Sequence, residues 1–190
     1  MPAWRYWLIV AIWMVWEGYW IVSAFGTKCA EQKESWISRG PIVIGIVLAA
    51  CLLLFPYWFG GFIDRSFTGQ GDATYFPGLW LAIGGIGFAF WARHVLGRNW
   101  SGRVTIKEGH ELVTAGPYRW VRHPIYTGAL LGFTGSALAL GRVGGLIAIA
   151  IMFAIFTRKI WLEEKMLDQH FGERYAEYRH KTKALIPLLY

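Results

Sequence analysis

A short polar stretch beside a long apolar segment holds most of the side chains that could do chemistry. Residues 116–128 read GPYRWVRHPIYTG and combine two arginines, a histidine, two tyrosines and two prolines. Pro117 and Pro124 restrict the backbone, so neighbouring donors point in set directions and lose little entropy on binding. Arginine and histidine can donate to a carboxylate, and tyrosine offers a hydroxyl and a ring face for a cation. We expect a site that holds a small charged molecule beside lipid.

Two adjacent acids, Glu163 and Glu164, follow the next pair of apolar runs. Neighbours on a helix point about 100° apart, so at most one of them faces the loop of His123 directly. An acid here can bind an ammonium group or pair with Arg122. The alternative is a salt bridge to a basic residue of the same helix, such as Lys159. For the loop itself, the alternative is a set of interfacial anchors with an aromatic belt.

Other polar residues give weaker signals. Glu17 lies inside the first apolar run, where an acid either serves a site or bonds to another helix. Arg93 and His94 end the third run and are expected at the interface. His110 is near His123 in sequence, but no HxxxH or HxxEH spacing occurs, so we expect no bound metal. The two cysteines form no CxxC pair and indicate neither zinc nor a disulfide.

The elements that must position these residues are hydrophobic. Of the 190 residues, 55% are hydrophobic and only 16% are charged, and the mean hydropathy is +0.36. A bilayer core needs about 20 helical residues. Five apolar runs span or approach that length: Trp4–Phe25, Pro41–Phe62, Tyr75–Leu96, Ile125–Leu140 and Val143–Trp161. The sequence predicts an all-α integral membrane protein, multi-pass, with about five transmembrane helices and a helical C-terminal tail.

The last two runs are separated only by Gly141-Arg142, which predicts a tight helical hairpin. The tail over residues 160–180 is helical by pattern, with an interruption at Gly172. In the third run, the glycines of residues 84–87 favour close helix packing, either within the chain or against a second copy. We therefore leave open whether the protein is a monomer or a homodimer.

Charge predicts the orientation. Residues 93–122 hold six bases against two acids, and residues 158–183 hold seven against five. By the positive-inside rule these segments face the cytoplasm, and five helices then place the N-terminus outside. Only Arg5 and Arg142 fall on the opposite side. The net charge of +7 reflects this topology and attraction to membrane lipids. Nucleic acid is not expected as a partner, because the bases adjoin spans and form no separate soluble domain.

We expect one domain in two parts. Residues 1–96 form three N-terminal transmembrane helices, and residues 97–190 carry nearly all the chemistry. Within the second part, separate motifs resemble the isoprenylcysteine carboxyl methyltransferase family and the related phospholipid N-methyltransferases. The motifs are LGRNWS (96–101), EGHELVTAGPYRWVRHPIYTG (108–128), EEKML (163–167) and FGERYAEYRHKTKALIP (171–187). They occur in the family's order and cover about half of the chain.

The resemblance implies a membrane methyltransferase that uses S-adenosylmethionine, bound at the cytoplasmic face under a C-terminal helical cap. It implies a lipophilic or lipidated acceptor that enters from the bilayer, and an inner or plasma membrane if the chain is bacterial. The implied cofactor pocket comprises His110, Leu112, Val113, Gly116, Pro117, Tyr118, His123, Pro124, Tyr126, Glu163 and Glu164. Glu163 or Glu164 would bind the methionine amino group, and Arg122 or His123 its carboxylate. Arg98 or Arg103 could hold an acceptor carboxylate, and the alternative for both is contact with interfacial lipid. The candidate catalytic residues are Arg98, Arg122 and Glu164.

Three other functions are weighed. A lipid-amine N-methyltransferase would share the motifs. A sterol-reductase-like enzyme would bind NADPH, but the intact RHPIYTG string is more similar to the methyltransferases. A transport protein would need several inward-facing polar groups, whereas Glu17 is the only acid in the first two runs.

Overall fold

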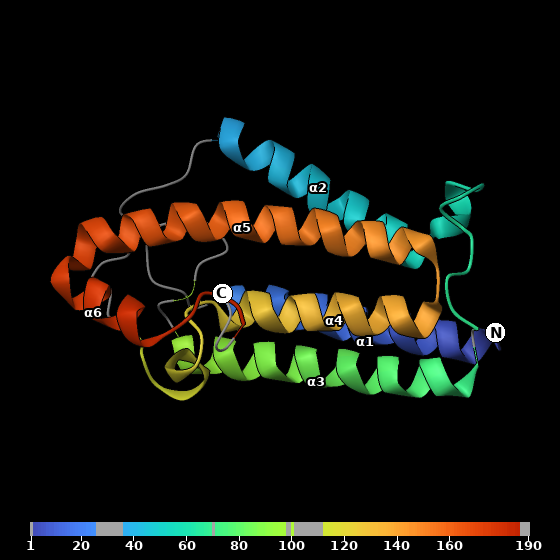
Figure 1. The fold of residues 1–190 in the computed structure, drawn as a ribbon, viewed down its shortest axis with the longest axis horizontal. Helices are drawn as coiled ribbons and strands as arrows, with labels where there is room; N and C mark the ends of the chain where they lie inside the picture. Colours follow the sequence, from blue (N-terminus) through green and yellow to red (C-terminus); the bar gives the residue numbers. More distant parts are fainter. Residues whose placement is uncertain (1, 26–35, 70, 98–99, 101–111, 187–190) are drawn as a thin grey trace.

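The computed structural model describes residues 2–25, 36–69, 71–97, 100 and 112–186 of the chain. Apolar runs form long helices that lie side by side, and the chain passes back and forth along one axis (Figure 1). The helices are α1 (Ala3–Ala24), α2 (Trp36–Leu54), α3 (Asp72–Leu96), α4 (Pro124–Leu140), α5 (Val143–Phe171) and α6 (Glu173–Lys181), with short 3-10 turns η1 (Pro56–Trp58) and η3 (Gly116–Arg119). In the described part, β pairing is limited to two isolated bridges. The expected all-α fold is confirmed.

Helices α3 and α4 pack closely because each presents small residues to the other. A Cβ atom added at Gly85 would lie 2.7 Å from the carbonyl oxygen of Gly128, and one added at Gly135 would lie 2.3 Å from the nitrogen of Ala82. Glycine is therefore required where the two backbones touch. Gly84, next to Gly85, has no such neighbour. The expected glycine contact is thus made within the chain, through Gly85.

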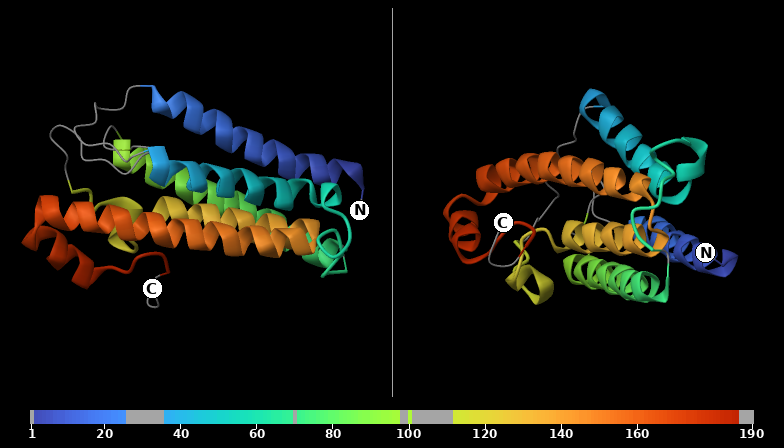
Figure 2. Two further views of the ribbon diagram at one scale, coloured as in Figure 1. Left: turned by 90° about the horizontal axis from the view of Figure 1, so that it is seen from above. Right: turned by 45° about the vertical axis from the view of Figure 1, so that its right-hand side comes forward.

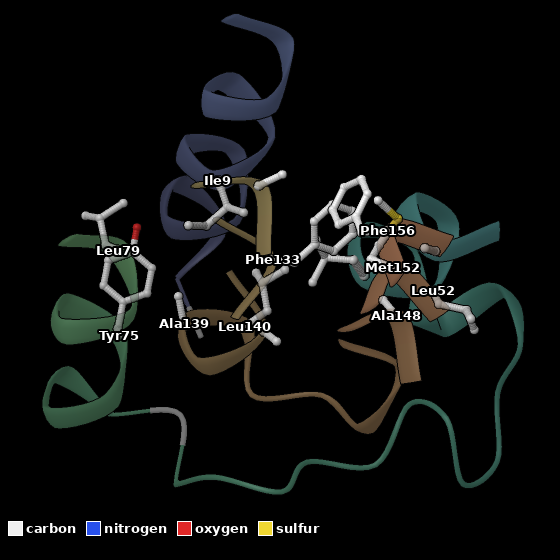
Figure 3. Close-up of a cluster of buried hydrophobic side chains, with 14 residues drawn as sticks. Ile9, Leu52, Tyr75, Leu79, Phe133, Ala139, Leu140, Ala148, Met152 and Phe156 are labelled. Carbon is white, nitrogen blue, oxygen red and sulfur yellow. The ribbon is translucent and has the colours of Figure 1, made fainter. Parts of the chain in front are cut away.

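One hydrophobic core joins the helices of both halves of the chain (Figure 3). Ile9 of α1, Tyr75 of α3, Phe133 of α4 and Met152 of α5 all contribute fully or almost fully buried side chains. Helix α1 is fastened to this core by Trp13, whose indole donates to the Ser136 hydroxyl at 3.0 Å and whose ring meets Phe133 at 4.6 Å.

The hairpin between α4 and α5 is as tight as predicted. Gly141 ends α4 in the left-handed conformation, with φ of +66°, and Arg142 precedes the first residue of α5. A loop docks on this turn: Phe67 donates its N–H to the carbonyl of Gly141 at 3.0 Å, and Val143 donates to that of Arg65 at 2.9 Å. This end of the molecule also holds the N-terminus, opposite α6 (Figure 1).

Two helix boundaries differ from the expectation. The second run was expected to continue to Phe62, but α2 ends at Leu54, because Pro56 cannot donate a backbone hydrogen bond and restricts the residue before it. Helix α5 does not end near Trp161 but continues to Phe171, since no glycine or proline intervenes before Gly172, whose φ is +54°. Helix α6 then folds back beneath the end of α5 (Figure 2).

Three helical segments are long and apolar enough to cross a membrane: Ala3–Ser23, Asp72–Leu96 and Val143–Phe171. Two further apolar segments, Gly40–Leu54 and Pro124–Leu140, are shorter. The helix α4 has 17 residues and is about 26 Å long, against a hydrocarbon core of about 30 Å. The membrane class is therefore supported by three helices, and the count of five spans stays a prediction.

Candidate functional site

The turn before α4 is held in place by the tail that follows α6. Arg122 donates its backbone N–H to the carbonyl of Lys183 at 2.8 Å, and His123 donates to that of Ala184 at 3.0 Å. Val121 and Lys183 form a parallel bridge. These contacts bring the turn against residues 182–185, which we call the C-terminal strap. The backbone on each side of the His123 ring is thus fixed by a segment distant in sequence.

Side chains reinforce the strap. Thr127, in the first turn of α4, donates its hydroxyl to the carbonyl of Leu185 at 2.7 Å. The buried hydroxyl of Tyr178 donates to the carbonyl of Tyr118 at 2.7 Å, which links α6 to η3. Burial raises the pKa of both tyrosines, and each stays a neutral donor near neutral pH.

Arg122 joins α4's entry turn to α5 and to the strap. Its Nε lies 2.7 Å from Oε1 of Glu164. Its Nη1 donates to the carbonyls of Thr182 and, at 3.3 Å, of Arg179. Only 9% of the Arg122 side chain and 13% of that of Glu164 are accessible to solvent. The guanidinium is therefore engaged by this chain's own acceptors on two sides.

His123 lies between the two acids. Its Nδ1 is 3.4 Å from Oε2 of Glu163, and its Nε2 is 3.3 Å from Oε1 of Glu164. A neutral imidazole has one N–H, whereas two carboxylate neighbours favour a donor on both nitrogens. Burial alone lowers the pKa of His123, but the hydrogen bonds and negative charges of the two glutamates outweigh it and raise this pKa above its usual value. The imidazolium form is favoured.

Glu163 has fewer charged partners. The hydroxyl of Tyr126 donates to its Oε1, and the His123 ring faces its Oε2. The Tyr126 ring stacks on His123 and on Phe156 of α5, with centroid separations of 5.7 and 4.6 Å. Lys159 places its ammonium 5.3 Å from the Tyr126 centroid. An aromatic column thus runs from the carboxylates into the apolar bundle.

A cavity of about 280 Å³ lies beside α6. It is lined by Leu112, Thr114, Arg174, Glu177, Tyr178 and Lys181. Tyr178 lines this cavity, and its hydroxyl donates a hydrogen bond to the carbonyl of Tyr118 in η3, just before the turn that carries His123. In the described part of the chain, no three His, Cys, Asp or Glu side chains form a group that could hold a metal ion.

The structure brings together most of the expected site. Arg122, His123, Tyr126, Glu163 and Glu164 form one hydrogen-bonded network. Pro124 follows His123 directly and is buried. Gly116, Pro117 and Tyr118 form η3 just before the turn, and of these Pro117 and Tyr118 are buried. Leu112 and Val113 lead into this turn and are partly buried. The salt bridge to Lys159 that was the alternative for the acids does not form, because both acids face the turn instead.

Five other residues named in the sequence analysis either lie outside this network or fall outside the described part of the chain. Arg98, Arg103 and His110 lie outside the described residues, so their roles stay predictions. Glu17 is exposed on α1. Arg93 was expected at the interface but is 6% exposed: its guanidinium donates to the carbonyls of Gly97 and Ser23 and joins the ends of α3 and α1.

The sequence led us to expect the tail as a cap, but not its direct contacts with the site. Arg179 places Nε 3.8 Å from Oε2 of Glu164, and Thr182 supplies a carbonyl to Arg122. Tyr175 is 1% exposed, and its hydroxyl has no hydrogen-bond partner among the described residues. The motif at residues 171–187 was the sequence signal that the tail belongs to the site. It does not indicate that the segment following Gly172 folds back onto the turn before α4.

Comparison with known proteins agrees with this geometry. Residues 73–174 match the family described as phospholipid methyltransferase. A probable protein-S-isoprenylcysteine O-methyltransferase of Oryza sativa subsp. indica is 27% identical over 195 residues, which cover 96% of each chain. The protein-S-isoprenylcysteine O-methyltransferase of Schizosaccharomyces pombe is 36% identical over 96 residues, which cover 49% of this chain and 41% of the relative.

A solved structure has the same fold. It is the eukaryotic intramembrane Ras methyltransferase ICMT, an isoprenylcysteine carboxyl methyltransferase, with a TM-score of 0.61 and 25% sequence identity. The match covers 79% of this chain and 53% of that chain, so this chain spans about half the length of the solved structure.

Proposed function

Because the chain belongs to the phospholipid methyltransferase family and is a membrane methyltransferase, we propose that it methylates the carboxylate of an isoprenylcysteine-like acceptor, using S-adenosylmethionine. The names of the rice and yeast relatives and of the solved structure support this acceptor. One observation carries the proposal: two carboxylates of α5 meet the Arg122-His123 turn at one end of an apolar bundle. A charged donor and a lipophilic acceptor can meet at such an end.

The residues present fit the cofactor. When bound, S-adenosylmethionine supplies an electrophilic methyl group on a positively charged sulfur. Glu163 and Glu164 give the site negative charge, and Tyr126 adds an aromatic ring on which a cation can lie. Gly116, Pro117 and Tyr118 shape the backbone beside them, and Leu112 and Val113 add apolar surface. His110 completes the proposed pocket from outside the described residues.

The protein's task in this reaction is mainly to position and to exclude water. An acceptor carboxylate is ionised at neutral pH and needs no general base. The strap and η3 fix the turn that carries His123, which limits motion of the pocket. We assign the acceptor carboxylate to Arg98 and to the cytoplasmic basic segments, and its lipid chain to the apolar side of α4 and α5. The site then faces the cytoplasm, under a cap formed by α6 and the strap.

A lipid-amine acceptor is the second candidate, because the matched family is described by phospholipid methylation. An amine must lose a proton before it attacks, so this reaction needs a base where the carboxylate reaction needs none. Glu163, which is 24% exposed, is the acid best placed for that task.

The two functions are separated by one assay. Purified protein in lipid nanodiscs is given radiolabelled S-adenosylmethionine and, in parallel, a short S-prenylcysteine, its carboxamide, or phosphatidylethanolamine. We expect label on the prenylcysteine acid and none on the amide. Label on phosphatidylethanolamine instead would establish the second candidate, and label on neither would overturn the proposed acceptor class.

A further inference from the structure

A run of exposed aromatic side chains follows α2, at the end of the molecule opposite the site (Figure 1). Residues 55–62, which we call the aromatic segment, read FPYWFGGF. Its large exposed side chains are those of Tyr57, Trp58, Phe59 and Phe62, with exposed fractions of 57%, 65%, 43% and 66%. Large apolar side chains gathered on one surface mark a place where another apolar phase or molecule makes contact.

The backbone of the aromatic segment is fixed to the bundle. Pro56 is buried, and a Cβ atom added at Gly144 of α5 would lie 3.2 Å from the Cβ of Pro56. Gly144 also donates its N–H to the carbonyl of Ile63 at 2.9 Å. The ring of Trp58 stacks on that of Phe55, with centroids 4.4 Å apart and planes 10° apart. The segment is therefore held against the start of α5 at both of its ends, while the aromatic rings between them stay exposed.

Helix α2 is short for a membrane span, and the aromatic segment continues its apolar surface. The apolar part of α2, Gly40–Leu54, is about 22 Å long, against a hydrocarbon core of about 30 Å. Exposed side chains such as Ile44 give α2 a surface for lipid. Residues 41–63 contain no Asp, Glu, Lys or Arg, and the first charge after them, Asp64, pairs with Arg142 of the hairpin at 3.3 Å. An uncharged surface thus runs from α2 through the aromatic segment.

The polar atoms of the segment indicate which partner covers it. Among the described residues, neither the hydroxyl of Tyr57 nor the indole N–H of Trp58 has a hydrogen-bond partner. An apolar protein surface would leave both donors buried and unpaired, which costs free energy. The boundary between lipid headgroups and acyl chains instead offers acceptor oxygens beside an apolar phase, and tyrosine and tryptophan are enriched there for this reason.

We propose that the aromatic segment lies along the headgroup–acyl boundary of the membrane leaflet opposite the site, and that it anchors the end of α2, whose apolar part alone is too short to do so. The second apolar run is then a helix followed by an interfacial segment, and not one continuous span. This contact is at the far end of the molecule from the site, so it does not depend on the proposed function.

Two spin labels test where the segment lies. In protein with Cys29 and Cys51 replaced by serine, a nitroxide is attached at Phe62→Cys or, as the water-facing control in the same loop, at exposed Ser66→Cys. In liposomes of phosphatidylcholine and phosphatidylglycerol, collisions with oxygen report on lipid and collisions with a nickel chelate report on water. We expect a several-fold higher oxygen-to-nickel ratio at position 62, corresponding to burial by about 5–10 Å in the interface. Equal ratios at the two positions would overturn the proposal.

A second comparison separates contact with lipid from contact with protein. Dipolar broadening at position 62 that disappears on dilution with unlabelled protein would show a second copy on this surface and would also overturn the proposal.

Substitution of the aromatic rings gives a matched pair. With the label at position 62, Tyr57→Asp combined with Trp58→Asp should lower the ratio to that of position 66, because carboxylates are costly to bury. Tyr57→Phe combined with Trp58→Phe keeps the rings and should leave the ratio high. A ratio that the aspartates do not change would contradict an anchoring role. Should the aspartate variant fail to fold, the comparison of positions 62 and 66 still decides the question.

Discussion

His123 has a carboxylate oxygen beside each of its two ring nitrogens, and this governs how the site responds to pH. Folding raises the pKa of His123, because the two glutamates stabilise its charged form more than burial destabilises it. A raised pKa adds stability that is complete below the ordinary value of about 6.5 and is lost as pH rises through the folded value.

We therefore expect the unfolding temperature of the wild type to fall as the pH rises above about 6.5 and through the raised pKa of His123. His123→Gln should flatten this part of the profile. His180→Gln, at an exposed position of α6, is the control and should keep the wild-type slope. Differential scanning fluorimetry in detergent measures all three profiles, and parallel slopes for wild type and His123→Gln would contradict the ion network.

Tyr178 and Tyr175 are two buried tyrosines of α6 whose replacement by phenylalanine tests how the cap is held. The Tyr178 hydroxyl donates to the Tyr118 carbonyl, so Tyr178→Phe should lower the free energy of unfolding by about 1–2 kcal/mol. The Tyr175 hydroxyl is buried without a partner in the described part of the chain, so Tyr175→Phe should leave stability unchanged or raise it. Chemical denaturation of both variants tests this, and equal losses would count against the link between α6 and η3.

At this scale the sequence singled out residues that the structure brings into contact, but it left their pairing open. Arg122, His123, Glu163 and Glu164 stand out because polar types adjoin apolar runs. Their mutual contacts depend on side-chain directions that one sequence cannot fix. It is these contacts that separate the engaged acid, Glu164, from the more open one, Glu163.

Among the elements, α3 and α4 set the frame that supports the site. Their backbones approach at glycines, so added bulk must push the helices apart or distort them. Because α4 begins directly after His123, a shift of α4 would move the turn as well.

Gly85→Ala and Gly84→Ala test this frame. A Cβ at Gly85 would meet backbone atoms of α4 at 2.7 Å, and we expect a loss of about 1–3 kcal/mol in the free energy of unfolding. The neighbouring Gly84 faces open space, so its replacement should be neutral within about 0.5 kcal/mol. Thermal unfolding in lipid compares the two. Equal tolerance of both changes would show that α3 and α4 do not touch at Gly85.

The helices themselves were largely readable from the sequence, because apolar runs and their breakers are local signals. Gly141 and Gly172 mark real ends, and Pro56 explains the early end of α2. The strap was not readable, because the pairing of Val121 with Lys183 joins segments that are far apart along the chain. The periodicity of hydrophobic residues along a sequence does not reveal such a long-range contact.

On the scale of the whole molecule, the two ends differ in charge. The site end holds the bases of α6 and of the strap, whereas the opposite end holds Arg65, in the loop before α3, and the two expected exceptions, Arg5 and Arg142. Each of these two exceptions is ion-paired there, Arg5 with Asp72 and Arg142 with Asp64. A neutralised base exerts little pull on topology, so both exceptions are compatible with a cytoplasmic site.

This orientation can be checked by labelling. With Cys29 and Cys51 replaced by serine, a cysteine at exposed Ser66 should react with a membrane-impermeant maleimide in intact cells. A cysteine at exposed Glu177, on α6, should react only after permeabilisation. The reverse pattern would place the site on the outer face.

The most direct test of the account is cofactor binding at the turn between the carboxylate pair and the cap. Isothermal titration of S-adenosylhomocysteine into the protein in nanodiscs should give one site per chain, and Glu163→Gln should weaken it at least about tenfold. Exposed Glu173→Gln, at the first residue of α6 and outside the lining of the cavity, is the matched acidic control for a general loss of charge. No binding to a folded wild-type protein, in detergent and in lipid alike, would contradict the claim that this end of the bundle is a methyl-donor site.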